Sequence, residues 1–134
     1  MNTSAKGELA VLKVLERCID RDVIASRPTT ECNRYDLVLD VDGKLWRAQV
    51  KYGNGGSGQS SGCVSVRLAS VGRKGERAYS SQEIDVILVY LPKTDKVYWL
   101  PKEVWEGKGR LSIRLEPTKN KQGRRCNTAT DFEW

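Results

Sequence analysis

The sequence contains no histidine, which excludes several common kinds of active site. Without histidine there is no Ser-His-Asp or Cys-His nucleophilic machinery and no histidine-ligated zinc, iron or copper centre. The cysteines, Cys18, Cys32, Cys63 and Cys126, show no C-x-x-C spacing, so a structural zinc site is not expected either. Any metal ion would therefore be held by oxygen atoms.

The sequence also lacks a long hydrophobic run. No stretch offers the roughly 18 consecutive apolar residues that a membrane-spanning helix requires, and residues 1–7 are polar overall. We therefore expect no membrane association and no export signal. Unpaired cysteines in such a chain favour the reducing cytoplasm.

Basic residues outnumber acidic ones in this chain of 134 residues. There are 23 lysines and arginines against 17 aspartates and glutamates, which gives a formal charge of +6. A chain of this length is typical of one domain with its own core, so we expect a single domain over residues 1–134. The positive charge favours a polyanionic partner, although a merely soluble basic surface would have the same composition.

The hydrophobic pattern predicts an α+β fold, with an N-terminal helix followed by a mixed β-sheet of about five strands. The helix is expected over residues 5–20, with Ser4 as its N-cap. Its apolar side is expected to carry Leu9, Leu12, Leu15 and Ile19, with Val11 and Cys18 beside them. Strand-like runs occupy residues 23–26, 35–41, 44–51, 63–68, 84–91, 97–100 and 111–115. One helical turn is expected at residues 102–105.

Two segments are expected to lie outside the regular elements. Residues 53–62 contain five glycines and three serines, a composition that predicts a flexible loop. Residues 117–134 are expected to form a basic C-terminal tail, in which Trp134 gives no signal. Three other tryptophans, Trp46, Trp99 and Trp105, are expected to anchor the core or an interface.

A β-hairpin around Asp42 and Gly43 is the most informative prediction, because this dipeptide favours a type I′ turn. Pairing the residues on either side of the turn places Asp36 opposite Gln49, with Lys51 one step further on the same face. The opposite face is expected to pack on the core. It carries Leu37, Leu39, Val41, Trp46, Ala48 and Val50.

The polar face of this hairpin suits phosphodiester hydrolysis. Directly opposed residues of antiparallel strands have Cβ atoms roughly 4.5 to 5.5 Å apart, so oxygens of Asp36 and Gln49 can surround one ion. Magnesium accepts one or two carboxylates and keeps several waters. The ammonium group of Lys51 could orient the attacking water or stabilise the developing charge. A solvated hairpin face would show the same pattern.

Glu8 is a possible second carboxylate. Its spacing to Leu12 and Leu15 places it on the inward side of the predicted helix, where a charge needs a partner. A glutamate in the first turn also interacts favourably with the helix dipole, so both interpretations stay open.

The order of several short motifs resembles the PD-(D/E)XK nuclease superfamily. These motifs are Lys6-Gly7-Glu8, Arg34-Tyr35-Asp36-Leu37-Val38, Asp42-Gly43-Lys44, Gln49-Val50-Lys51 and Glu83-Ile84-Asp85. The similarity is greatest to a small branch that contains a bacterial group I intron homing endonuclease. Archaeal Holliday junction resolvases are more distant relatives.

This resemblance implies a restriction-endonuclease-like core and a magnesium-dependent endonuclease that cuts double-stranded DNA at a defined site. It also implies a homo-oligomer, either a dimer or a tetramer. Asp36 matches the family's metal-binding acid and Lys51 its catalytic lysine. Gln49 stands at a metal-ligand position where most members have an acid. Val11 stands where one alignment places a glutamate, which leaves Glu8 as the candidate for a second carboxylate.

Basic residues outside the hairpin are the expected DNA contacts, since they can neutralise phosphates without reading sequence. They are Arg73, Lys74, Arg77, Lys119, Lys121, Arg124 and Arg125. Base contacts are expected from residues 57–67 and 73–79.

Three alternative functions remain open at this point. A Holliday junction resolvase would read shape and phosphates in place of sequence. A noncatalytic DNA-binding module on the nuclease fold is favoured by Gln49 and Val11. A basic domain that binds protein partners is the third.

Overall fold

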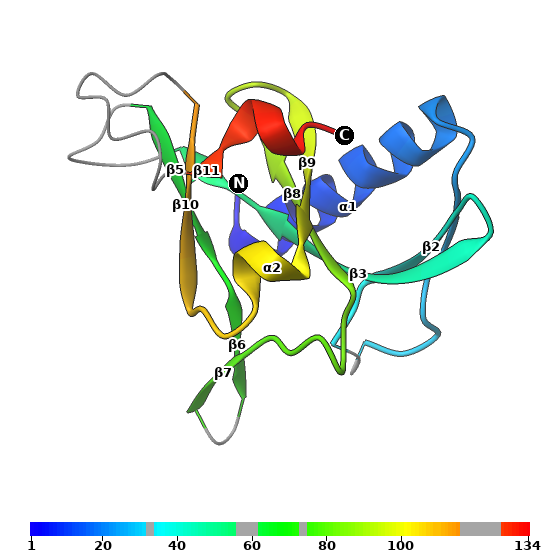
Figure 1. Ribbon diagram of the computed structural model, residues 1–134, viewed down its shortest axis with the longest axis horizontal. Coiled ribbons are helices and arrows are strands. Elements are labelled where there is room, and N and C mark those ends of the chain that lie inside the picture. The colour runs from blue at the N-terminus through cyan, green and yellow to red at the C-terminus, as the bar shows by residue number, and fades with distance from the viewer. Residues whose placement is uncertain (32–33, 56–61, 73–74, 116–126) are drawn as a thin grey trace.

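The computed structural model describes residues 1–31, 34–55, 62–72, 75–115 and 127–134. A five-stranded sheet forms its centre, with the helix α1 (Thr3–Asp20) on one face (Figure 1). Its strands lie in the order β1 (Ile24–Ser26), β2 (Leu37–Val41), β3 (Lys44–Tyr52), β8 (Val86–Leu91) and β9 (Lys96–Pro101).

This central sheet is mixed, because β3 and β8 run parallel while its other neighbours are antiparallel. The short helix α2 (Lys102–Trp105) follows β9, as expected for the helical turn. The predicted α+β fold, with an N-terminal helix and a mixed sheet of five strands, is therefore confirmed.

The hairpin of β2 and β3 has the predicted register. Val41 pairs with Lys44 and Leu37 with Ala48. Its turn consists of Asp42 and Gly43, whose φ angles of 52° and 83° are those of a type I′ turn. The register therefore places Gln49 across from Asp36, one step before the start of β2.

The helix α1 differs from its prediction at its start. Asn2 is the N-cap, and its side-chain oxygen accepts a hydrogen bond from the Ala5 N–H at 2.8 Å. Ser4 lies inside the first turn, so the predicted cap was wrong.

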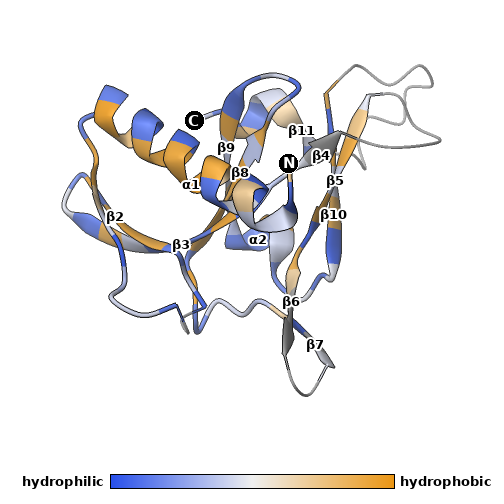
Figure 2. Ribbon diagram, turned by 180° about the vertical axis from the view of Figure 1, so that it is seen from behind, coloured by the Kyte–Doolittle hydropathy of each residue, from blue (hydrophilic) through white to orange (hydrophobic). Residues whose placement is uncertain are grey.

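The buried side of α1 differs in part. Val11 and Cys18 are buried as expected, together with Ala10 and Val14, and Leu9 and Leu15 pack beside them. Leu12 and Ile19 were placed wrongly, since they are 51% and 76% exposed. Figure 2 shows the hydrophobic side of the helix turned toward the sheet. Small and β-branched side chains at the contact allow the helix axis to approach the strands closely, and the leucines flank it.

A second sheet, which the sequence analysis did not predict, covers the other face of the central sheet. Its strands lie in the order β11 (Asn127–Thr128), β10 (Arg110–Arg114), β5 (Cys63–Arg67) and β4 (Asn54–Gly55). A two-stranded hairpin of β6 (Ala69–Gly72) and β7 (Gly75–Ala78) extends from it (Figure 1).

The predicted loop over residues 53–62 was wrong at its first residues. Gly53 is buried, and residues 54–55 form β4. Residues 56–61 lie outside the described part of the chain.

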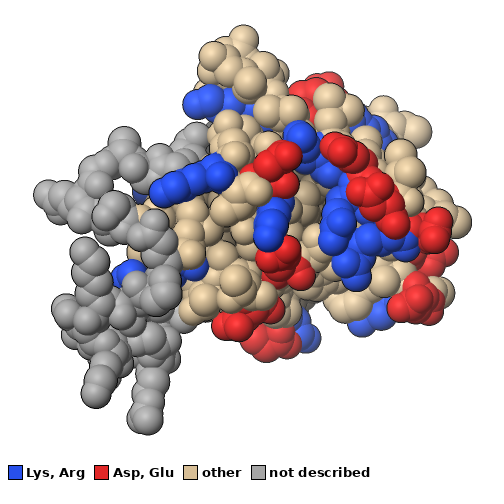
Figure 3. Space-filling model, turned by 90° about the horizontal axis from the view of Figure 1, so that it is seen from above, with Lys and Arg blue, Asp and Glu red and all other residues tan. Residues whose placement is uncertain are grey.

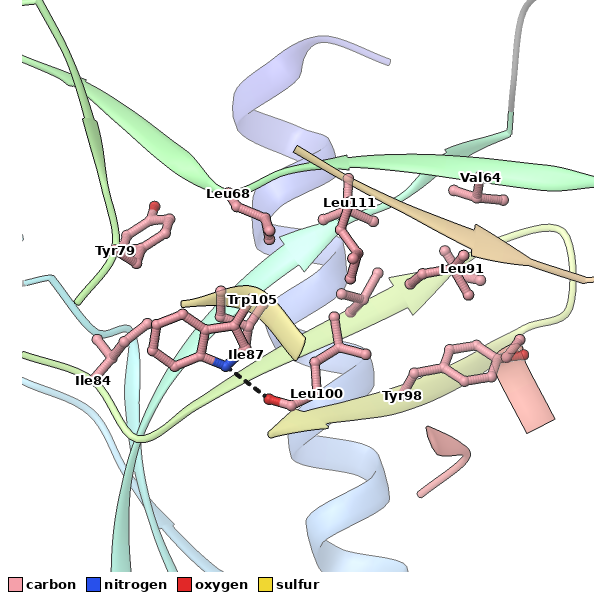
Figure 4. Close-up of a cluster of buried hydrophobic side chains, with 14 residues drawn as sticks. Val64, Leu68, Tyr79, Ile84, Ile87, Leu91, Tyr98, Leu100, Trp105 and Leu111 are labelled. Atoms are coloured by element: carbon pink, nitrogen blue, oxygen red, sulfur yellow. Dashed lines mark hydrogen bonds between the residues drawn. The ribbon is translucent and has the colours of Figure 1, made fainter. Parts of the chain in front are cut away.

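The core between the two sheets is apolar and continuous (Figure 4). All six residues of β8 are buried, with alternate side chains packed against α1 and against the second sheet. Trp105 is fully buried, and its indole N–H donates to the Leu100 carbonyl at 3.0 Å. None of the helices in the described part of the chain is both long and apolar enough to cross a membrane.

The C-terminal residues pack against the body of the molecule. They form β11 and the 3-10 helix η2 (Ala129–Phe132). The N–H of Trp134 donates to the Val97 carbonyl at 3.0 Å, and its ring centroid lies 5.4 Å from that of Trp99. Arg17 Nε donates to the Trp134 carbonyl at 2.6 Å. The predicted tail was therefore wrong over residues 127–134, and residues 117–126 lie outside the described part.

Candidate active site

Asp36 is anchored between the two strands of the hairpin. Its N–H donates to the Ala48 carbonyl at 2.8 Å, and its Oδ2 accepts the N–H of Val50 at 2.9 Å. The first bond fixes the backbone and the second fixes the carboxylate. Asp36 Oδ1 accepts no hydrogen bond from the described residues, so one oxygen of the carboxylate is available to a ligand.

Partial burial makes the charge of Asp36 costly. Burial raises the pKa of the Asp36 carboxyl above its usual range, and the nearby charge of Glu8 acts in the same direction. The hydrogen bond from Val50 and the positive charges of Lys51 and Arg27 oppose this rise without cancelling it. A bound cation would stabilise the ionised form of this group.

Gln49 and Lys51 extend from β3 on the face opposite to α1. Their neighbours Ala48 and Val50 belong to the cluster packed under the helix, so alternation turns Gln49 and Lys51 the other way. The Gln49 side-chain nitrogen donates to the Val50 carbonyl at 3.5 Å, and its Oε1 accepts no hydrogen bond from the described residues. Alternation therefore puts Gln49 and Lys51 on the face opposite to α1, whereas Asp36 lines a pocket together with residues of α1.

Tyr79 supports Lys51 from the loop that follows β7, and the sequence analysis missed this residue. Its ring is 4% exposed, and its centroid lies 4.9 Å from the ammonium nitrogen of Lys51. The guanidinium of Arg34 lies 4.4 Å from the same centroid, while its Nη2 donates to the Ala78 carbonyl at 3.0 Å. Because both cations contact the same aromatic ring, the end of β3 and the segment before β2 are held next to each other. No sequence pattern shows this, because the contact joins distant segments.

Glu8 lies on the exposed side of α1, so the predicted inward orientation was wrong. Its side chain is 55% exposed, and its Oε1 lies 3.0 Å from Arg27 Nη2. Leu12, from which the inward face was inferred, is itself exposed. Glu8 nevertheless opens on the same pocket as Asp36.

This pocket has a volume of about 310 Å³. Its lining includes Glu8, Val11, Arg27, Thr30, Tyr35 and Asp36. Val11, which is nearly buried, presents an apolar side chain to it. The carboxylates that line this space are those of Glu8, Glu31 and Asp36, and Arg27 pairs with Glu8.

The donor set fits a weakly held magnesium ion. In the part of the chain that the structure describes, no three acidic or cysteine side chains converge on one point. Magnesium does not require such a cluster, because one carboxylate and several waters suffice. Asp36 would supply the charge and Gln49 a neutral oxygen, with Glu8 available if its ion pair opens.

The motif at residues 83–85 has a structural role. Asp85 Oδ2 accepts the backbone N–H of Arg47 at 2.8 Å and its Nε at 3.0 Å. The hydrogen bonds from Arg47 lower the pKa of the Asp85 carboxyl. Glu83 pairs with Arg34 and with Arg77. These contacts join the loop before β8 to the hairpin.

Among the predicted DNA contacts, only Arg77 lies in the described part of the chain. It stands on β7 with a side chain that is 63% exposed and paired with Glu83. The described residues around it form the β6–β7 hairpin. The others lie outside the described residues: Arg73, Lys74, Lys119, Lys121, Arg124 and Arg125.

Comparison with known proteins matches this arrangement to one family. The model of a family described as PD-(D/E)XK endonuclease matches residues 1–134. Among solved structures, the bacterial homing endonuclease I-Ssp6803I superposes with a TM-score of 0.78 at 23% identity, over 99% of this chain and 89% of that one. No curated protein matches. The restriction-endonuclease-like core expected from the sequence is confirmed by this structural similarity.

Proposed function

The chain belongs to the PD-(D/E)XK endonuclease family, and on that premise we propose that it cuts double-stranded DNA at a defined site, using a magnesium-dependent centre built on Asp36 and Lys51. Membership of the family makes it a DNA endonuclease and hence a hydrolase. The magnesium ion, the defined site and the residue roles are our proposals. The observation that supports them is that Asp36 lies across from Gln49 in the register of the hairpin, has one carboxylate oxygen that accepts no hydrogen bond from the described residues, and has its pKa lowered by the nearby charge of Lys51.

Asp36 holds the cation in this proposal. Its Oδ2 is fixed by the Val50 N–H, which leaves Oδ1 to bind, while Gln49 adds an amide oxygen from the opposite strand. When bound, the ion supplies positive charge that stabilises the transition state of phosphodiester hydrolysis. Partial burial of Asp36 strengthens its attraction to a cation, because water screens the charge less there.

Lys51 acts on the scissile phosphate. Its ammonium group contacts the Tyr79 ring and is near enough to Asp36 to lower the pKa of that carboxyl, and in this proposal it offsets negative charge that develops on the phosphoryl oxygens. It can also donate a hydrogen bond to the attacking water. Because Tyr79 is buried, the position of the ammonium group is set before DNA arrives.

Homing-type cleavage is the form of the reaction that we propose. The structural match is described as a bacterial homing endonuclease, and that description supports the analogy at the level of fold. Cutting both strands of a duplex needs two copies of the site, so we also propose a homo-oligomer, a dimer or a tetramer.

A noncatalytic DNA-binding module is the second candidate. Two observations favour it: the Glu8 carboxylate is occupied by Arg27, and Val11 presents no acid to the pocket. In that case Asp36 and Lys51 would serve only to shape the surface.

A plasmid assay separates these candidates. Supercoiled plasmid is incubated with the parent protein in magnesium and in EDTA, and with Asp36→Asn, Lys51→Ala and Lys93→Ala. The last is a matched control, because Lys93 is exposed in the turn between β8 and β9. We expect nicking by the parent and by Lys93→Ala in magnesium alone, and a loss of at least about 100-fold in the other two variants.

Other results would contradict the proposal. Nicking by Asp36→Asn or Lys51→Ala at the parental rate would remove these residues from the active centre. Binding of DNA without nicking by any protein would support the noncatalytic module. Preferential cutting of four-way junctions, whatever their sequence, would indicate a resolvase.

A further inference from the structure

The outward face of the second sheet is a rigid platform of polar and basic side chains. We define the β5/β10 face by its outward positions, which are Cys63, Ser65 and Arg67 on β5 and Arg110, Ser112 and Arg114 on β10. The alternate, inward residues are the buried Val64, Val66, Leu111 and Ile113. Because their inner side is locked into the core, these strands present the outward side chains from a fixed backbone.

The register places like charges side by side on this face. Arg110 stands directly opposite Arg67, and Ser112 opposite Ser65. Arg110 Nη1 donates to Ser65 Oγ at 3.3 Å, which orients its guanidinium along the sheet. The face therefore presents guanidinium groups from both of its strands.

A hollow of about 220 Å³ on this face is lined by basic groups. Lys108, Arg110 and Arg114 contribute to it, and the described residues that line it include no aspartate or glutamate. Arg114 Nε is buried and has no hydrogen-bond partner among the described residues. A buried donor without a partner is costly and is satisfied when a ligand supplies an acceptor.

The end of the molecule shown in Figure 3 is different, because blue and red side chains alternate there. Elsewhere α1 and β9 show the same balance. Lys13 pairs with Asp95 at 3.0 Å, and Lys96 with Glu133 at 2.9 Å. Intermixed charges of this kind give no net attraction for a polyanion.

Few residues of the chain separate Lys51 from the sheet that carries the β5/β10 face. Lys51 on β3 is followed by Gly53 and then by Asn54, which pairs with Ser65 on β5. Three residues of extended chain span at most about 10 Å. A duplex whose scissile phosphate meets Lys51 therefore has neighbouring nucleotides within reach of this sheet.

The spacing of the outward residues also suits a duplex. Alternate residues on a strand repeat at about 6.8 Å, which is close to the rise of two base pairs. β5 and β10 are the two central strands of a four-stranded sheet, so their outward arginine and serine side chains suit contacts to phosphates and base edges of a duplex that lies across the sheet.

From these observations we propose that the β5/β10 face binds the DNA duplex beside the cleavage position, with Lys108, Arg110 and Arg114 as its main contacts. The inference rests on the proposed function, since it assumes that DNA is the substrate. It adds contacts from residues 108–114 to those of β5, which lies within the segment 57–67 from which base contacts are expected.

The test measures duplex binding as a function of salt. The Asp36→Asn protein keeps the DNA uncut and serves as the starting point, into which Lys108→Gln, Arg110→Gln or both are introduced. Lys93→Gln is the matched control, because it removes one positive charge from an exposed turn. Binding of a long duplex is followed by fluorescence anisotropy across a series of NaCl concentrations.

We expect the slope of log K against log[NaCl] to become shallower by about one for each lost contact. The double variant should bind about 10-fold more weakly at physiological salt, while Lys93→Gln behaves as the starting protein. Both Lys108 and Arg110 are exposed, so thermal melting is expected to confirm that the variants stay folded. Arg114→Gln, tested separately, should give a similar change of slope.

Two results would overturn the proposal. An unchanged slope and affinity in the double variant and in Arg114→Gln, with magnesium-dependent nicking intact in the parent, would remove this face while the endonuclease proposal stands. Equal competition by duplex RNA would show that the face does not select DNA. A parent that binds no DNA and nicks no plasmid would refute the proposed function itself.

Discussion

Replacing Gly53 with alanine tests how tightly the chain is packed where β3 ends and the second sheet begins. Gly53 follows β3 directly, and its N–H donates to the Tyr90 carbonyl at 2.8 Å. A Cβ atom added at Gly53 would overlap Leu91 Cδ2 and lie 3.1 Å from Val64 Cγ1. Leu91 and Val64 are both in the core between the sheets, so neither can move away freely.

The expected cost follows from overpacking. Adding one methyl group to a filled core typically costs about 1 to 3 kcal/mol. For a chain of 134 residues the unfolding entropy is about 0.28 kcal/mol/K, so each kcal/mol corresponds to about 3.5 °C in the melting temperature. Gly53→Ala should therefore lower the melting temperature by about 4 to 10 °C.

Gly7→Ala is the matched control. Gly7 lies inside α1, and a Cβ there would meet nothing within 4 Å. Alanine in an open helical position stabilises by about 0.5 to 1 kcal/mol, so this variant should melt about 2 to 4 °C higher. Differential scanning calorimetry of the parent and both variants measures the two shifts. A melting temperature for Gly53→Ala within 1 °C of the parent value would refute the close packing of Leu91 and Val64 around Gly53.

Three further predictions concern the candidate site. Asp36→Asn should abolish nicking, and in EDTA at neutral pH this variant should melt above the parent. The fold raises the pKa of the Asp36 carboxyl, so the protonated carboxyl stabilises the folded parent, and this stabilisation is lost as pH rises through that pKa. The difference in melting temperature between the variant and the parent should therefore vanish at low pH. Tyr79→Leu should lower kcat for nicking about 10-fold while Tyr79→Phe stays near the parent, since only the aromatic ring holds Lys51; equal rates would exclude a positioning role. Val11→Glu should cost about 1 to 3 kcal/mol without metal and show a larger rise in melting temperature on adding magnesium than the parent does; an unchanged magnesium response would place position 11 away from the ion.

The elements predicted correctly from the sequence are those whose signals are local. The hairpin register followed from alternation and from the turn at Asp42 and Gly43, and both are contained within a few residues. The buried strand β8 followed from an uninterrupted apolar run. Because Gln49 lies on this hairpin and Asp36 directly before it, their position across from each other could be predicted as well.

The features that were missed depend on contacts between distant segments. The buried side of α1 was misjudged because leucine is the more hydrophobic residue, whereas close packing on the sheet selects Ala10 and Val14. Strands of two residues, such as β4 and β11, carry no periodic signal. The contact of Tyr79 with Lys51 and the docking of Trp134 on Val97 likewise join parts of the chain that no local pattern relates.

The difference between local and distant pairing has a consequence for the order of folding. The strand that follows Asp36 and the strand that carries Lys51 are joined by a two-residue turn, whereas Arg110 pairs with Arg67, which lies 43 positions earlier in the sequence. Loop closure makes the second step slower, so the β2–β3 hairpin aligns early and the second sheet completes the molecule. Substitutions in the hairpin should therefore change the refolding rate, and those in β10 chiefly the unfolding rate.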